Sequence, residues 1–177
     1  MQDKIVIKIF VLMLLVQPLV VFAHAVFLPK EAEAGSYHRA AIKIGHGCEG
    51  APTIEIIIDI PESVHLVKPM PKPGWQIEIV KVTLAEPYDS HGKLITGDVR
   101  QLIWHGGNLP EEYYDEFIFH MKLPVIPGKL YFPVRQICTK GENFWNEIPK
   151  DDAHHYDHHY SFPAPVLELI ETHTESK

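Results

Sequence analysis

His24 directly follows a segment that has the layout of a secretory signal peptide. Two lysines precede the apolar run 9–16, and the small residue Ala23 stands at the expected cleavage position. This run is too short to span a bilayer, because a spanning helix needs about 20 apolar residues. We therefore interpret residues 1–23 as a signal peptide, which leaves residues 24–177 as the mature protein.

Cleavage after Ala23 would make His24 the first residue of the mature protein. Its free amine and the Nδ1 atom of its imidazole would then be close enough to chelate one metal ion. Cu(II) favours tetragonal sets of nitrogen and oxygen ligands and lies at the top of the affinity order for divalent ions. However, Ala23-His24-Ala25 is itself an A-x-A cleavage pattern. Cleavage after Ala25 would make Val26 the first residue and would remove the chelate, so the sequence leaves two sites open.

A second group of possible metal ligands lies in the segment 151–160, which contains four histidines and three aspartates. Such a composition cannot form a packed core, so we expect an exposed loop within the mature domain. His-rich tracts often bind Zn, Ni or Cu. We predict a secondary, weaker and less selective site, with a solvated insertion of only adventitious affinity as the alternative. Its ligands would be His154, His155, His158 and His159.

Cys48 and Cys138 are the two cysteines of the chain, and both lie in the exported part. An even number of cysteines in an oxidising compartment predicts a disulfide. The alternative is a thiolate metal site that includes the neighbouring His46.

Short, β-branched segments with alternating polarity predict an all-β fold. The chain also contains 15 prolines, which suit strand edges and turns better than a helical bundle. We predict a single antiparallel β-sandwich of the immunoglobulin or cupredoxin type, with turns at 69–74, 106–108 and 127–128 and one short helical turn at 109–116. The expected strands are 53–60, 75–84, 117–123, 129–137 and 166–170.

The formal net charge of −7 argues against nucleic acid or an anionic membrane as the main partner and suits the capture of cations. No later stretch reaches membrane-spanning length, and no cysteine follows the signal to take a lipid anchor. We expect a periplasmic or secreted protein without a membrane anchor. No Ser-His-Asp or Cys-His catalytic group is recognisable, so we do not expect an enzyme.

Ordered blocks along the whole mature chain resemble the YcnI-like family of exported copper-binding β-sandwich proteins. The His-rich loop departs from the family pattern, as does the lack of the C-terminal membrane segment that many members have. The matching blocks begin with HAVFLP at 24–29 and AGSY at 34–37, and continue with GCEGAPT at 47–53, VKPMPKPGW at 67–75, WHGGNLP at 104–110, YDEF at 114–117, YFPVRQIC at 131–138, GENFW at 141–145 and PAP at 163–165.

The resemblance implies a Cu(II) site of the single-histidine brace type, built on His24 as the first residue of the mature protein. It points to Glu116 as the carboxylate ligand and to Trp145 as the aromatic side chain beside the metal. It further implies a copper chaperone or storage protein in copper homeostasis, with other periplasmic or membrane copper-handling proteins as partners.

Two other functions remain open on the sequence. A copper oxidoreductase would normally need a second imidazole, for which His46, His105 and His120 are the candidates. A metal-free interaction domain of the envelope would be favoured if the mature chain began at Val26.

Overall fold

The computed structural model describes residues 24–149 and 160–171, which form twelve β-strands and, within these ranges, no helix. The strands are β1 (Val26–Leu28), β2 (Glu31–Glu33), β3 (Tyr37–Ile44), β4 (Thr53–Asp59), β5 (His65–Pro69), β6 (Gln76–Ser90), β7 (Lys93–Leu109), β8 (Asp115–Lys122), β9 (Gly128–Tyr131), β10 (Val134–Cys138), β11 (Glu142–Trp145) and β12 (Val166–Ile170).

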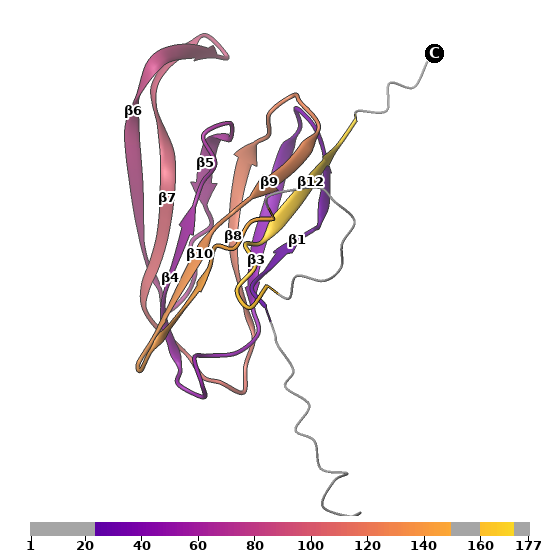
Figure 1. The fold of residues 1–177 in the computed structure, drawn as a ribbon. Helices are drawn as coiled ribbons and strands as arrows, with labels where there is room; N and C mark the ends of the chain where they lie inside the picture. The colour runs from indigo at the N-terminus through magenta and orange to yellow at the C-terminus, as the bar shows by residue number, and fades with distance from the viewer. Residues whose placement is uncertain (1–23, 150–159, 172–177) are drawn as a thin grey trace, which may run out of the picture.

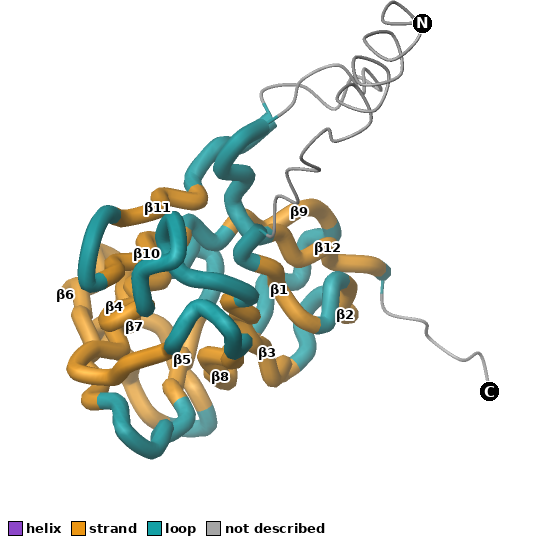
Figure 2. Tube along the Cα trace, turned by 90° about the horizontal axis from the view of Figure 1, so that it is seen from below, coloured by secondary structure: helices purple, strands orange, loops and turns teal. Residues whose placement is uncertain are grey.

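Two antiparallel sheets form the layers of a sandwich (Figure 1). The first has the strand order β1-β3-β8-β5, and the second has the order β11-β10-β4-β7-β6. A small third sheet, β2-β12-β9, adjoins the first layer, and Figure 2 shows β1 between this sheet and the β10–β11 pair. The predicted antiparallel β-sandwich is thereby confirmed.

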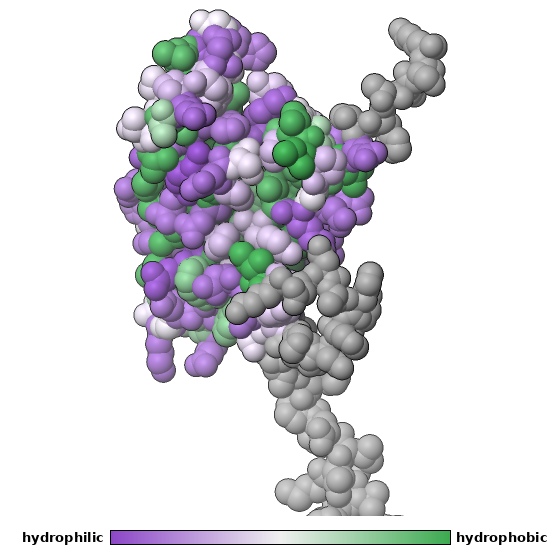
Figure 3. All heavy atoms as spheres, turned by 45° about the horizontal axis from the view of Figure 1, so that its top comes forward, coloured by the Kyte–Doolittle hydropathy of each residue, from purple (hydrophilic) through white to green (hydrophobic). Residues whose placement is uncertain are grey.

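The core lies between the layers because alternate side chains of each strand point inward. In β8, Phe117, Phe119 and Met121 are fully buried, whereas Glu116 and Ile118 are only partly buried. Glu116 is thus placed on the outer face of the first sheet. On the face of the molecule that Figure 3 shows, hydrophobic residues form separate patches among hydrophilic ones.

A disulfide between Cys48 and Cys138 ties the loop before β4 to the end of β10. The predicted pairing is confirmed, and neither cysteine remains as a thiolate for a metal site. Gln136, on β10, donates a hydrogen bond to the carbonyl of His46 at 2.6 Å. The disulfide therefore also fixes the segment that carries His46.

Three local predictions were wrong. Residues 110–114 form a turn closed by a Tyr113 N–H to Pro110 carbonyl bond of 3.1 Å, and there is no helical turn. Residues 106–108 lie within β7, because the Trp75 indole packs onto Gly107, where an added Cβ would lie 2.2 Å from the ring. The expected strand 129–137 is divided between β9 and β10, which belong to different sheets.

Candidate metal centre

His24 is the first described residue and stands two positions before β1. Its imidazole lies edge-on to the indole of Trp145, with the ring centroids 5.7 Å apart and the planes at 75°. Trp145 ends β11, an edge strand of the second sheet, and is only 4% exposed. The structure therefore brings together two residues that are distant in the sequence and that the family resemblance assigned to one centre.

The Nε1 atom of Trp145 is buried and has no hydrogen-bond partner in the described part of the chain. Buried N–H groups are normally paired, because an unsatisfied donor costs about 1–3 kcal/mol. Phe162 packs against the same indole with ring centroids 5.1 Å apart, and it offers no acceptor. The indole is thus a buried donor that lacks an acceptor among the described residues.

His46 also lies edge-on to the Trp145 indole, at 6.2 Å and 74°. Its Nδ1 atom lies 2.5 Å from the carbonyl oxygen of Gly47, and only the ring nitrogen can donate in that pair. Glu111 accepts a hydrogen bond of 2.5 Å from the N–H of Gly47. From the sequence, His46 was one of three candidates for a second imidazole and a member of the alternative thiolate site. Its position next to Cys48 in the sequence could not reveal the contact with Trp145.

Glu116 lies on β8, which is separated from β1 by β3. Lys43 pairs with Val26 on one side and with Glu116 on the other. Strand spacing and rise then put the Cα atoms of His24 and Glu116 about 12 Å apart. Lys43 lies on the strand between them, and its ammonium lies 5.5 Å from the centroid of the Tyr114 ring.

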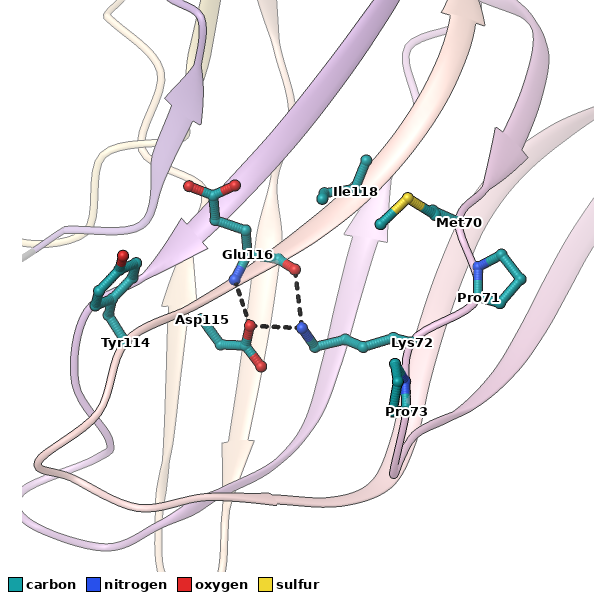
Figure 4. A pocket seen from close by; sticks show the side chains of 8 residues that line it. All are labelled: Met70, Pro71, Lys72, Pro73, Tyr114, Asp115, Glu116 and Ile118. Atoms are coloured by element: carbon teal, nitrogen blue, oxygen red, sulfur yellow. Dashed lines mark hydrogen bonds and ion pairs between the residues drawn. The ribbon is translucent and has the colours of Figure 1, made fainter.

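A pocket of about 540 Å³ borders Glu116 on the outer face (Figure 4). Lys72 reaches across it to the Asp115 carboxylate at 2.5 Å and donates to the Glu116 carbonyl at 3.0 Å. In Figure 4 the Glu116 carboxylate points away from Lys72. The lysine therefore neutralises Asp115 rather than the Glu116 carboxylate.

The other candidate histidines lie elsewhere. His105 is on β7, paired with Glu55 and Gln76 in the second sheet. His120 is exposed on the outer face of β8 and stacks on Tyr37 at 5.6 Å. Four histidines of the predicted secondary site, His154, His155, His158 and His159, are outside the described residues.

In residues 24–149 and 160–171, no three His, Cys, Asp or Glu side chains are grouped so that they could hold a metal ion. A histidine brace is a different kind of site, because the terminal residue supplies two of its ligands.

No helix that is long and apolar enough to cross a membrane occurs in the same part of the chain.

A polar cluster that sequence reasoning missed joins the two layers at the buried Asp98 of β7. Its carboxylate accepts from His65 Nδ1 at 2.5 Å and from the Tyr88 hydroxyl at 3.1 Å. Burial and the neighbouring Asp98 raise the pKa of Tyr88 to about 12. No local pattern marks Asp98, because its burial depends on strand β5 of the opposite sheet.

The chain is similar to a solved structure described as an uncharacterized protein from Nocardia farcinica with an immunoglobulin-like fold. The two share 20% sequence identity with a TM-score of 0.62, over 84% of this chain and 99% of the other. Among curated proteins, none matches.

A family model described as "Domain of unknown function (DUF1775)" matches residues 24–169. This is the family of the YcnI-like proteins that the sequence resembles. The match covers most of the chain and begins at His24, two residues before β1. The chain therefore belongs to the DUF1775 family.

Proposed function

We propose that the protein binds one Cu(II) ion outside the cytoplasm, through the amine and the imidazole of His24 as its first residue. The observation that supports this most is the position of His24 beside Trp145, at the residue where the family match begins. An α-amine has a pKa of about 7.7–8.0, so copper has to displace only one weakly held proton there.

Glu116 is the proposed carboxylate ligand. Its oxygen is a hard donor that would cancel part of the charge of Cu(II) in a partly buried site. The Trp145 indole would limit water access to the ion and could donate its N–H to an oxygen ligand.

A role in storing copper or passing it to other copper-handling proteins fits the rest of the chain. The disulfide is of the kind found in proteins of oxidising compartments. The net charge of −7 favours cations over nucleic acid or anionic lipid. We propose periplasmic or extracellular copper handling without catalysis.

One observation favours a copper oxidoreductase as the second candidate, namely the contact of His46 with the same indole as His24. Oxygen consumption with ascorbate separates the two functions. A carrier should consume oxygen no faster than free Cu(II) at the same concentration, whereas an oxidoreductase should turn over many times per copper.

The proposal is tested by calorimetric titration of Cu(II) into protein that begins at His24. We expect one tight equivalent that is lost in His24→Ala and in a protein that retains Ala23 as an N-terminal extension. Glu116→Gln should weaken binding, while the control Glu55→Gln, on β4, should not. Equal tight binding by the extended protein would contradict the proposal.

A further inference from the structure

Two imidazoles, those of His24 and His46, contact one buried indole. Their ring centroids are 5.7 Å and 6.2 Å from that of Trp145, and both approach it edge-on. The backbone explains this convergence. Val26 and Lys43 form the last pair of the β1–β3 ladder, so that His24, two residues before Val26, and His46, three residues after Lys43, leave the sheet at the same end.

The ring of His46 is oriented by a hydrogen bond from its Nδ1 to the Gly47 carbonyl, 2.5 Å away. In the neutral imidazole, a protonated Nδ1 leaves the lone pair on Nε2. Metal-binding histidines typically donate their other ring N–H to a carbonyl or carboxylate, which fixes the tautomer and makes the ligand nitrogen more basic. His46 therefore has the tautomer of an Nε2 ligand.

Two hydrogen bonds and the disulfide hold the segment around His46 in place. Its carbonyl accepts from the side chain of Gln136, which is 1% exposed, and the next N–H donates to Glu111. Gly47 allows this approach, because an added Cβ would lie 1.9 Å from the Ala51 oxygen. Cys48 then anchors the segment to β10 through the disulfide. Such support from neighbouring residues is what a preformed ligand needs.

We propose that His46 supplies Nε2 as a third nitrogen ligand of the copper centre. This inference rests on the proposed function, since it presupposes Cu(II) at the mature His24. The nitrogen ligands are then the amine and Nδ1 of His24 and Nε2 of His46. These three nitrogens fill three of the four positions in the tetragonal arrangement that Cu(II) prefers.

The test is pulsed electron paramagnetic resonance on the Cu(II)-loaded mature protein, which counts imidazoles through their remote ring nitrogens. His46→Asn is the informative variant, because its amide nitrogen can replace the Nδ1 donor to Gly47 while no Nε2 remains. His105→Asn and His120→Asn are matched controls on other faces. Circular dichroism and the intact disulfide establish that each variant is folded.

We expect two imidazoles in the wild type and in both controls, and one in His46→Asn. Copper affinity should fall at least about tenfold in His46→Asn, the smallest loss usual for even an outer-shell partner. If the wild-type protein shows only one imidazole on copper, the assignment of His46 is overturned and the proposed function stands. This result needs no variant. A wild type that binds no Cu(II) overturns both.

Discussion

The imidazole of His24 lies edge-on to the indole of Trp145, with centroids 5.7 Å apart. One residue begins the described chain and the other ends an edge strand of the opposite sheet, so this contact joins the two layers at the proposed metal centre. It also makes Trp145 an optical reporter of that centre.

Cu(II) bound at His24 should quench the fluorescence of Trp145 more than that of Trp75 and Trp104. We expect Trp145→Phe to remove most of the copper-dependent quenching, and Trp75→Phe to retain it. Trp145→Ala should also lower the free energy of unfolding by about 3–5 kcal/mol, because the indole is buried. Undiminished quenching in Trp145→Phe would place the copper elsewhere.

Removal of the disulfide should destabilise the domain. Cys48 and Cys138 are 90 residues apart, and closing such a loop lowers the unfolded-state entropy by an amount worth about 4.5 kcal/mol. We expect the Cys48→Ser/Cys138→Ser double variant to lose up to about that much free energy of unfolding, as measured by urea denaturation. A variant with wild-type stability would show that the link does not constrain the unfolded chain.

Gly47→Ala tests how closely the loop around His46 is packed. The new Cβ would lie 1.9 Å from the backbone oxygen of Ala51 and 2.8 Å from Glu111. Since a backbone oxygen cannot move aside as a side chain can, we expect a loss of about 1–3 kcal/mol in unfolding free energy. Gly50→Ala is not a neutral control, because Gly50 has a φ of 85°. Ala51→Ser, which adds no atom at position 47, should change stability much less.

Stability should decrease in mild acid because of His38. Burial, and secondarily the charge of His120, lower the pKa of His38. The unfolded chain therefore takes up a proton near pH 6.5 while the folded chain resists it, so stability is lost as the pH falls below about 6.5. His38→Gln should flatten the dependence of Tm on pH between 7.5 and 5. His120→Gln should flatten it less, and an unchanged slope in His38→Gln would contradict the assignment.

The sequence predicted the fold class because the information is local. Alternation in segments such as 53–60 and 166–170 directly reports strands with one buried face. The pairing of strands into sheets was harder to predict from the sequence. Phe132 and Pro133 divide one apolar run between two sheets, and residues 106–108 continue a strand in which Trp75 packs on Gly107.

Much of the candidate site could not be derived from spacing. The contact of His24 with Trp145 spans most of the chain and depends on how two edge strands meet. His46 was recognisable as a possible ligand but not distinguishable from His105 or His120. Only the packing against Trp145 and the hydrogen bond to Gly47 separate it from them.

The most direct test of the account is the N-terminal sequence of the exported protein, determined together with its copper content. We predict that the mature chain begins at His24 and retains one copper per molecule after desalting. A mature chain that begins at Val26 lacks the terminal amine and the imidazole of His24, and that result would contradict the proposed copper centre.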